Sequence, residues 1–376
     1  MKIAIVVNSA WAAYNFRSNL ASSFESLGHK VTFIVPFDAE YSDKLKKNFN
    51  CKNYYLNAGG LNPFQDIKTL LSLINVFKSL KPDIVCNFTI KPNIYGSIAA
   101  KINTIPSISN ITGLGTVFIR RNIFTLFVGL LYRVALSFSN LVYFQNIQDQ
   151  DFFVRNKFIK QAKTQLLPGS GVDLTRFKPS NLTSKTDVFV FLLISRVIKD
   201  KGVYEFIEAI RRVKRDFPNV QLEFQILGEV EVENRTVIQK SELEKWIEDG
   251  LVNYLGVTNE VEKVIAKCDC VVLPSYREGM PRSILEAFAM EKPVIVSNVP
   301  GCVDIVDHQV NGLICKVKSH KDLADKMITM FSMSQTLRNE MALNGRTKVE
   351  NFFDENIVIN QYIESIQAIV SNEKTI

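Results

Sequence analysis

The sequence predicts an α/β protein with two doubly wound, Rossmann-like parallel sheets, and three observations lead to this fold class. Short β-branched runs alternate with helical stretches along the whole chain. The chain has 376 residues, more than one hydrophobic core usually serves. A stretch rich in Gly, Pro, Ser and Thr, residues 168–187, separates two halves that both show the alternation. We therefore expect domains at 1–170 and 171–355 that face across a cleft lined by strand ends, and a final helix at 356–376 that packs back on the first domain.

The expected elements follow the alternation of apolar runs and helical patterns in chain order. In the first half, strands are expected at 2–7, 30–36, 83–88, 107–111, 141–146 and 164–167, and helices at 15–27 and 94–102. In the second half, strands are expected at 188–195, 221–227, 252–255, 270–274 and 293–297, and helices at 202–213, 241–248, 261–266 and 281–290. Residues 356–370 are predicted to form a long helix with no strand after it.

Composition indicates a packed globular protein in a reducing compartment. Hydrophobic residues make up 47% of the chain, which disfavours a disordered one. The N-terminal apolar run is short and lacks the cleavage site of a signal peptide, so we interpret it as the first strand. No two cysteines form a C-x-x-C pair, and most lie in strand-like runs, so we expect buried reduced thiols and a cytosolic setting. The six cysteines are Cys51, Cys86, Cys268, Cys270, Cys302 and Cys315.

The net charge of +7 is unevenly divided between the two halves. Residues 1–180 carry 21 Lys and Arg against 9 Asp and Glu, whereas residues 181–376 carry 24 against 29. A basic first half fits an anionic membrane surface, a pyrophosphate or a nucleic acid. No sequence signature of a nucleic-acid-binding module is present, so we expect no nucleic-acid partner.

An apolar segment, residues 122–140, raises the question of membrane contact. Its continuous apolar part is too short to span a bilayer, and a central Arg133 is costly there. The favoured interpretation is a buried or partly exposed helix between sheets. The alternative is an interfacial helix, with Arg120, Arg121 and Arg133 at headgroup level and apolar side chains below.

A phosphate-binding motif is predicted where the first strand of the second half ends. The sequence "SRVIKDKG" places Arg196 and Lys201 at the strand end and the start of the next helix. Arg can bind two phosphate oxygens at once, Lys supplies a mobile charge, and Gly202 permits close approach. Two basic residues in a loop are more often simply solvated, so this motif alone does not establish a site.

A second motif, "REGMPRSILEA", carries two glutamates with seven residues between them. Pro281 suits the first turn of a helix, so Glu278 is expected in the loop and Glu286 on the helix. Carboxylates here can accept hydrogen bonds from sugar or ribose hydroxyls, and the amides of Gly279 and Met280 can face a pyrophosphate. The structural alternative for Glu278 is a salt-bridged loop with the neighbouring arginines at 277 and 282.

Together these motifs resemble the donor site of retaining glycosyltransferases of family 4, which have the GT-B fold. The resemblance covers nearly the whole chain and includes "SRVIKDKG", "LPSYREGMPRSILEAFAMEKPVIVSNVPG" and "PGSGVD". "TIKPNIYGSIAAK" and "NITGLGTVF" further resemble bacterial members that build capsule, O-antigen or other glycan chains on undecaprenyl diphosphate.

The resemblance implies a role for each donor-side residue. Arg196 and Lys201 would neutralise the diphosphate of a UDP-sugar, Glu278 would bind hydroxyls of the donor sugar, and Glu286 would bind the ribose. Gly279, Met280 and Pro281 would form the loop around the donor. The leaving phosphate oxygen would take the acceptor's proton, with no covalent nucleophile. A glycoside hydrolase needs a pair of carboxyl groups flanking one sugar, and the assignment of Glu286 to ribose leaves Glu278 without a partner.

The acceptor side of the sequence has weaker signals. The resemblance makes Thr112, Gly113 and Gly115 candidates for facing the acceptor. Asn8 follows the first strand, and Arg17 or Lys91 would meet the acceptor's diphosphate unless each is a surface cation. The three histidines, at 29, 308 and 320, lie away from the acceptor loop, which leaves open which group assists the acceptor hydroxyl.

Two further patterns carry little functional weight. The "DQD" at 149–151 matches a metal-binding D-x-D, but it starts a helix, where acidic residues are favoured anyway. The "GLG" at 113–115 lacks the third glycine of a dinucleotide fingerprint. We therefore expect neither a metal ion nor a dinucleotide cofactor.

The sequence thus predicts a glycosyltransferase that moves an N-acetylhexosamine or hexose from a UDP-sugar to an undecaprenyl-diphosphate-linked saccharide. We expect it to act peripherally at the cytoplasmic face of the inner membrane. Two alternatives stay open: a nucleotide-sugar epimerase of the same fold, and a non-catalytic protein that binds sugar nucleotides.

Overall fold

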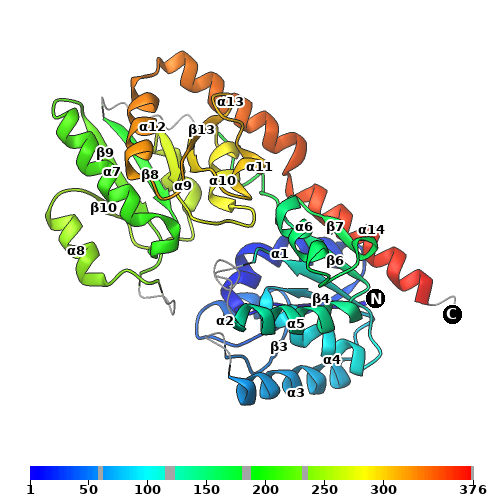
Figure 1. Ribbon diagram of the computed structural model, residues 1–376. Coiled ribbons are helices and arrows are strands. Elements are labelled where there is room, and N and C mark those ends of the chain that lie inside the picture. Colours follow the sequence, from blue (N-terminus) through cyan, green and yellow to red (C-terminus); the bar gives the residue numbers. More distant parts are fainter. Residues whose placement is uncertain (58–61, 115–122, 180–187, 231–235, 374–376) are drawn as a thin grey trace. The chain divides into compact units, whose positions relative to one another are not determined.

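A computed structural model describes residues 1–57, 62–114, 123–179, 188–230 and 236–373 (Figure 1). The chain divides into two compact units, each with its own sheet. The first unit comprises Met1–Ser170 together with Asn356–Ile376, and the second comprises Gly171–Glu355. The chain therefore passes from one unit to the other twice, and its last helix belongs to the unit in which the chain began.

The first unit contains a seven-stranded parallel sheet in the order β3-β2-β1-β4-β5-β6-β7. Its inner strands are almost fully buried on both faces, as expected for a parallel sheet covered by helices. The strands are β1 (Lys2–Val6), β2 (Lys30–Val35), β3 (Asn50–Asn53), β4 (Ile84–Phe88), β5 (Ser107–Ile111), β6 (Leu141–Phe144) and β7 (Thr164–Leu166).

Helices cover both faces of this sheet. One apolar core joins the sheet to α1, α2 and α14, and a second core joins its other face to α3, α4, α5 and α6. The helices are α1 (Ala10–Ser26), α2 (Tyr41–Lys46), α3 (Pro63–Leu80), α4 (Ser97–Ile102), α5 (Ile123–Phe138), α6 (Ile147–Arg155) and α14 (Glu355–Glu373).

The second unit contains a six-stranded parallel sheet in the order β10-β9-β8-β11-β12-β13. The strands are β8 (Phe189–Ile194), β9 (Leu222–Leu227), β10 (Asn253–Tyr254), β11 (Cys270–Leu273), β12 (Val294–Ser297) and β13 (Gly312–Cys315). The helices are α7 (Val203–Asp216), α8 (Lys240–Glu248), α9 (Val261–Ala266), α10 (Arg282–Ala289), α11 (Cys302–Ile305), α12 (His320–Ser332) and α13 (Gln335–Phe352).

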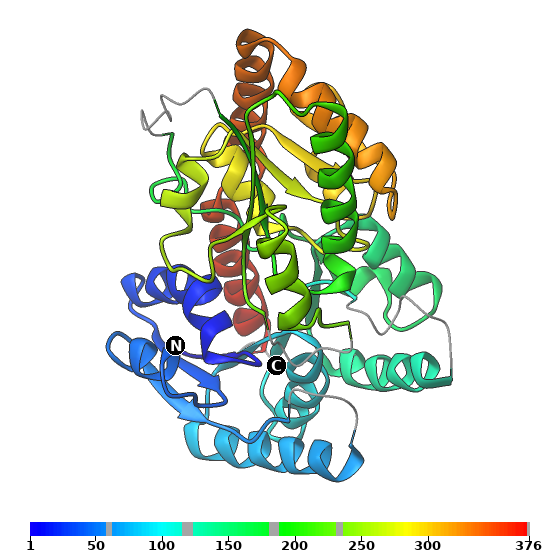
Figure 2. The same cartoon turned by 90° about the vertical axis from the view of Figure 1, so that its left-hand side faces the viewer.

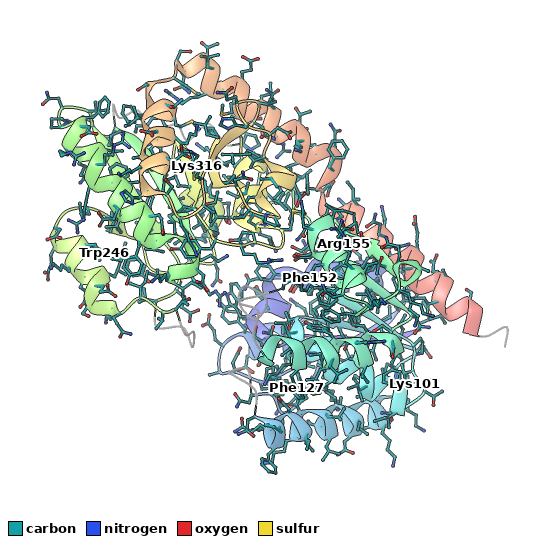
Figure 3. The ribbon with its side chains drawn as sticks, viewed as in Figure 1. Lys101, Phe127, Phe152, Arg155, Trp246 and Lys316 are labelled. Carbon is teal, nitrogen blue, oxygen red and sulfur yellow. The ribbon has the colours of Figure 1, made fainter. Side chains whose placement is uncertain are left out.

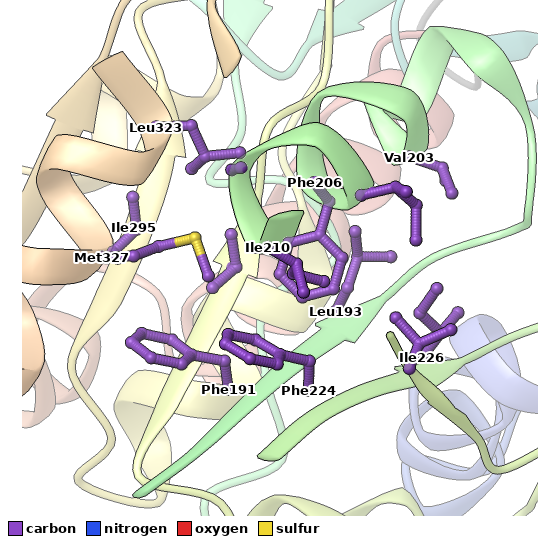
Figure 4. Close-up of a cluster of buried hydrophobic side chains, with 14 of the residues drawn as sticks. Phe191, Leu193, Val203, Phe206, Ile210, Phe224, Ile226, Ile295, Leu323 and Met327 are labelled. Carbon is purple, nitrogen blue, oxygen red and sulfur yellow. The ribbon is translucent and has the colours of Figure 1, made fainter. Parts of the chain in front are cut away.

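The core on one face of this sheet is shown in Figure 4. Phe191 of β8 stacks on Phe224 of β9 with ring centroids 5.6 Å apart, and Phe206 of α7 closes over them. Helix α7 is strongly amphipathic, so its apolar stripe packs on the sheet and its charged residues face outward. This packing fixes the position of the loop between β8 and α7, where the phosphate-binding motif was predicted.

Several element boundaries differ from the sequence-based prediction. Strand β3 was not predicted because its sequence, "NCKN", is polar; pairing with β2 at the sheet edge creates it. Strand β13, "GLIC", was also missed, and it forms by pairing with β12. Helix α1 begins at Ala10 rather than at 15, because the Ser9 side chain accepts a hydrogen bond from the Ala12 amide and caps the helix there.

The predicted helix at 94–102 begins earlier and in a different form. A π-helix, Pro92–Gly96, precedes α4. Its last residue lies against the buried side chain of Asn87: a Cβ on Gly96 would lie 2.1 Å from Asn87 Oδ1. Glycine at this position therefore allows the π-helix to pack on β4.

The C-terminal helix is anchored in the first unit. Tyr362, fully buried, lies 4.9 Å from the Tyr143 ring in centroid distance. The Tyr143 hydroxyl donates a hydrogen bond to the Gln361 carbonyl and lies 2.6 Å from Ser365 Oγ. These contacts make α14 part of the core that also contains β1 and β4.

All six cysteines are free thiols, five of them buried. This confirms the prediction of buried, unpaired thiols. Among the helices that the structure describes, none combines the length and the hydropathy that a bilayer span requires.

Candidate functional site

The six-stranded sheet reverses its strand order between β8 and β11. From β8 the chain adds β9 and β10 on one side, and β11, β12 and β13 lie on the other. Loops that follow two such neighbouring strands leave the sheet in opposite directions, and ligands of open α/β sheets bind in the crevice between them. The two motifs predicted from sequence are these two loops, after β8 and after β11.

The two loops are held together by backbone contacts. The Tyr276 amide donates a hydrogen bond of 2.9 Å to the Asp200 carbonyl. Gly202 has a φ of 73° and ends the 3-10 turn Lys199–Lys201, and a Cβ there would lie 2.1 Å from the Pro274 carbonyl oxygen. A glycine is therefore needed for this close approach as well as for the left-handed backbone.

The side chains of the two motifs meet in an ion pair. Lys201 Nζ lies 2.5 Å from Glu278 Oε1, and the two side chains are 21% and 10% exposed. From the sequence, we expected these two residues to bind different parts of a ligand, with the arginines at 277 and 282 as the structural alternative for Glu278. The structure places Glu278 in an ion pair with Lys201, which follows the adjacent strand β8. Arg196, also after β8, is exposed.

A third loop, between β12 and α11, packs against the Glu278 loop. Gly301, which precedes α11, has a φ of 80°, and a Cβ there would lie 2.4 Å from the Gly279 carbonyl oxygen. The Gly301 amide donates to Asp304 Oδ2 at 2.9 Å. Met280 packs partly into the core, and Pro281 is the N-cap of α10, one position earlier than predicted. The loop of 279–281 is thus fixed by contacts at both ends.

Glu286 lies on α10 and is only 9% exposed. Burial raises the pKa of this carboxyl, and Arg282 and Arg176 partly oppose the rise. Arg282 Nε donates to Glu286 Oε1 at 3.2 Å across one helical turn. A carboxylate offers about four lone-pair sites, so Glu286 can accept hydrogen bonds from hydroxyl donors in addition to the one from Arg282.

This edge of the second unit combines one exposed arginine, one lysine and two glutamates around loop amides. Such a set fits a ligand that carries both phosphate and hydroxyl groups. Cys302, which was not expected at this site, also lies here. Burial raises the pKa of its thiol, the charge of Glu278 adds to the rise, and the charge of Lys201 opposes it. Its position follows from the "VPGCVD" turn after β12, which carries no separate sequence signal.

The seven-stranded sheet has its own reversal of strand order, between β1 and β4. The predicted acceptor-side residues follow its central strands. Asn8 follows β1 and is half-buried, and Thr112 and Gly113 follow β5. Gly113 has a φ of 131°, which other residues rarely adopt. Gly115 lies outside the described residues, as do Arg120 and Arg121.

Lys91 follows β4 but is not a surface cation. Its ammonium lies 2.8 Å from Asp66 Oδ1 and donates to the Asn57 carbonyl at 2.6 Å. The two side chains are 12% and 8% exposed. The sequence could not show this pair, because Asp66 lies on α3, far from Lys91 along the chain.

Arg17 is not a surface cation either. It is 5% exposed on the inner face of α1, and its guanidinium lies 4.1 Å from the centroid of the Phe88 ring. This cation–π contact places a positive charge next to Phe88, the last residue of β4. Tyr362 lies beside the same ring, at 5.8 Å between centroids.

A buried hydrogen-bond network, which the sequence analysis missed, supports the loop after β5. Asn93 donates to the Asn110 carbonyl at 2.7 Å, and its Oδ1 accepts from the Asn110 amide at 3.1 Å. Asn110 Nδ2 in turn donates to the Tyr362 hydroxyl at 2.8 Å. The C-terminal helix thereby contacts the residue two positions before Thr112.

The aspartates of the "DQD" pattern have structural roles. Asp149 is buried in the first turn of α6, where its amide and carboxylate both bond Asn146. Asp151 pairs with Arg155 one turn later. Within the described residues, no group of three or more His, Cys, Asp and Glu side chains is placed to hold a metal ion.

Two family models match the chain. One, described as Glycosyl transferase 4-like, matches residues 2–146, and the other, described as Glycosyl transferases group 1, matches residues 175–348. The chain is 30% identical over 389 aligned positions to the N,N'-diacetylbacillosaminyl-diphospho-undecaprenol alpha-1,3-N-acetylgalactosaminyltransferase of Campylobacter jejuni, covering 99% of this chain and 100% of that protein. It is 27% identical over 302 positions to the UDP-Gal:alpha-D-GlcNAc-diphosphoundecaprenol alpha-1,3-galactosyltransferase of Escherichia coli, covering 77% and 76%.

Solved structures match the fold over the full length. A glycosyltransferase from Rickettsia africae superposes with a TM-score of 0.80 at 20% identity, covering 99% of both chains. HepE of Anabaena, in complex with UDP-glucose, superposes with a TM-score of 0.77 at 19% identity, covering 98% of this chain and 100% of that one. This likeness confirms the predicted fold class of two doubly wound parallel sheets.

Proposed function

We propose a function for this chain from one premise, that it belongs to the family 4-like, group 1 glycosyl transferases and is a glycosyltransferase. The proposed reaction moves a hexose or N-acetylhexosamine from a UDP-sugar to a saccharide linked to undecaprenyl diphosphate. The names of the Campylobacter and Escherichia coli relatives support this acceptor, and the complex of Anabaena HepE with UDP-glucose supports the donor.

The observation that carries the donor assignment is the Lys201–Glu278 pair at the strand-order reversal of the second unit. In our proposal, Lys201 and Arg196 bind the diphosphate, and Glu278 accepts hydrogen bonds from the donor sugar. The amides of Gly279 and Met280 and the ring of Pro281 surround the sugar. Glu286 accepts hydrogen bonds from the ribose, since the two oxygens of a carboxylate have more lone pairs than the hydrogen bond from Arg282 uses.

The proposed reaction retains the anomeric configuration. The bond between the anomeric carbon and the β-phosphate oxygen breaks, and a bond to the acceptor oxygen forms on the same face. The acceptor's hydroxyl proton passes to the leaving phosphate oxygen. Lys201 and Arg196 lower the barrier by stabilising the negative charge that develops on UDP. No metal ion is needed in this proposal, since the two cations supply the positive charge.

On the first unit, we propose that Asn8, Arg17, Lys91, Thr112, Gly113 and Gly115 form or support the acceptor side. Arg17 and Lys91 are engaged inside the unit, so their role here is to shape the loops after β1 and β4. We also propose that the protein acts at the cytoplasmic face of the membrane, where the acceptor's lipid lies.

The test is a panel of UDP-sugars combined with undecaprenyl-diphosphate-linked mono- and disaccharides, with product mass as the readout. We expect one pair to gain the mass of one sugar and to release UDP, and EDTA to leave the rate unchanged. UDP-sugar binding without product for any acceptor would favour a non-catalytic binding protein. Conversion of the UDP-sugar to an isomer without acceptor would favour an epimerase.

A further inference from the structure

The outer side of α5 in the first unit is apolar although it faces solvent. Its inner side packs Val128, Tyr132 and Leu136 into the core. A helix that is apolar on all sides is normally buried, so an exposed apolar stripe here calls for a partner. The exposed side chains recur at the helical spacing: Phe127 is 51% exposed, Leu130 57%, Val134 46% and Phe138 38%.

Two neighbouring helices extend this surface. On α3, Phe64 is 82% exposed, Ile67 54% and Leu71 53%, again at helical spacing. On α4, Ile102 is 58% exposed. These three helices pack on the same face of the seven-stranded sheet, and α4 contacts both α3 and α5 (Figure 2). We call the outer side of α3, α4 and α5 the α3–α5 surface.

The charged residues of the α3–α5 surface are basic. The sequences of the three helices contain one acidic residue, Asp66, and it is buried in the pair with Lys91. Figure 3 labels Phe127 and Lys101, which mark opposite ends of this layer. Lys163 adds a positive charge at the end of α5, where its ammonium donates to the Ser137 and Ser139 carbonyls at 2.8 and 2.9 Å. The exposed basic residues on the helices are Lys68, Lys78, Lys101 and Arg133.

We propose that the α3–α5 surface binds the surface of a bilayer that contains anionic lipids. The apolar stripes would lie among the acyl chains near the headgroups, and the four basic residues would contact lipid phosphates. A second copy of the chain docked through the same surface would bring positive charges against positive charges, which disfavours self-association. The proposal rests on the proposed function in one respect: a lipid-linked acceptor requires the first unit to work beside a membrane.

The first experiment measures sedimentation of the full-length protein with vesicles of phosphatidylcholine alone or mixed equally with phosphatidylglycerol. The test variant combines Phe127→Ser, Leu130→Ser and Val134→Ser. We expect its affinity for the mixed vesicles to fall at least about tenfold, because each substitution removes apolar groups that would be buried in the membrane. A matched control combines Leu337→Ser, Leu343→Ser and Phe352→Ser on α13 of the second unit, which are similarly exposed, and it should bind as the parent does.

The second variant tests the charges without touching the apolar stripe. It combines Lys68→Gln, Lys101→Gln and Arg133→Gln. We expect about a fivefold loss of affinity for each positive charge removed, on the mixed vesicles only, and a similar loss on raising the salt concentration. The control combines Lys240→Gln, Lys245→Gln and Lys316→Gln in the second unit, which removes equal charge elsewhere and should change binding little. This variant also keeps the test decisive should the serine variant fold poorly.

Three results would overturn the proposal. These are no binding of the parent to mixed vesicles at low salt, unchanged binding by both test variants, and a concentration-dependent dimer that only the test variants abolish. Transfer to a short-chain, buffer-soluble acceptor separates this proposal from the proposed function. The serine variant should keep that activity and lose transfer to a full-length acceptor in vesicles. If the serine variant loses vesicle binding but the parent transfers sugar to no acceptor, the membrane-binding surface is supported and the proposed function is wrong.

Discussion

The carboxyl edges of the two sheets differ in how their charged residues are used. In the second unit, Lys201 and Glu278 face one another at the strand-order reversal, and Arg196 stays exposed. In the first unit, the corresponding basic residues turn inward: Lys91 pairs with Asp66, and Arg17 lies over Phe88. In the second unit, charged groups at the edge can contact a ligand, whereas in the first unit the basic side chains are held by internal contacts.

This difference explains why the donor-side edge of the second unit could be predicted from the sequence and the acceptor-side edge of the first unit could not. Each donor-side loop is a continuous motif, so the residues that act together are close in sequence or lie on adjacent strands. The acceptor-side loop depends on Asn110 and Tyr362, which are 252 positions apart. The predictions below test whether the two edges have the separate roles that we propose, from the largest expected effect to the smallest.

The largest effect is expected at Glu278. In Glu278→Gln, the donor sugar loses a charged hydrogen-bond acceptor and Lys201 loses its partner, so kcat should fall on the order of 10²–10³-fold. UDP affinity should fall only modestly. Steady-state transfer and UDP titration measure the two quantities. Glu260→Gln, an exposed carboxylate paired with Lys263 in the same unit, is the control, and near-normal turnover in Glu278→Gln would disprove the sugar-binding role.

Gly202→Ala tests whether the donor edge depends on the close approach of its two loops. The added Cβ meets the Pro274 carbonyl at 2.1 Å and the backbone is left-handed, so we expect a loss of about 2–4 kcal/mol in the free energy of unfolding. Gly250→Ala has a similar positive φ but open space around its Cβ, so it should cost only about 1 kcal/mol. If both variants lost the same free energy of unfolding in denaturant titrations, the left-handed backbone alone would explain the loss, and the close approach to Pro274 would not.

Glu286→Gln should weaken UDP binding about tenfold, since a neutral amide accepts weaker hydrogen bonds from hydroxyls than a carboxylate does. Burial raises the pKa of Glu286, so this carboxylate protonates at a higher pH than an ordinary glutamate, whose pKa is about 4.3. UDP affinity of the parent should therefore fall on acidification before other glutamates titrate. Acidification should have the opposite effect on stability. Because the protonated form of Glu286 favours the fold, its contribution to the free energy of unfolding is present at low pH and is lost as the pH rises through the folded-state pKa.

Calorimetric titration of UDP between about pH 5 and pH 8 checks this dependence. The Glu286→Gln variant, which has no carboxyl to titrate at this position, should show a flatter profile. A profile of the same steepness in the variant and the parent would assign the pH dependence to another group.

The smallest effect is expected in the first unit. Tyr362→Phe removes the hydrogen bond from Asn110 and should cost about 1 kcal/mol of stability, with a rise of a few-fold in the KM for the acceptor. Tyr143→Phe also removes contacts to α14 but none to Asn110. It should therefore lower stability similarly and leave KM unchanged. A KM change of equal size in both variants would show that α14 acts only through general anchoring.

Most of the fold was predictable because its strands are apolar and its helices have helical spacing. The misses have physical causes. The polar edge strand β3 exists only through pairing with β2, and the start of α1 depends on the cap that Ser9 forms. The π-helix before α4 depends on the fit of Gly96 against Asn87, which only the packed unit reveals.

The sequence alone determined the two-sheet fold class, the two donor-side loops and the residue types on them, since each is encoded within a short continuous segment. Only the tertiary structure decided that Lys201 and Glu278 pair, that Lys91 and Arg17 turn inward, and that Tyr362 reaches Asn110. The reason is that a partner's identity depends on which strands are neighbours and which side chains lose water together. Those conditions arise from packing across long sequence separations, and no local pattern records them.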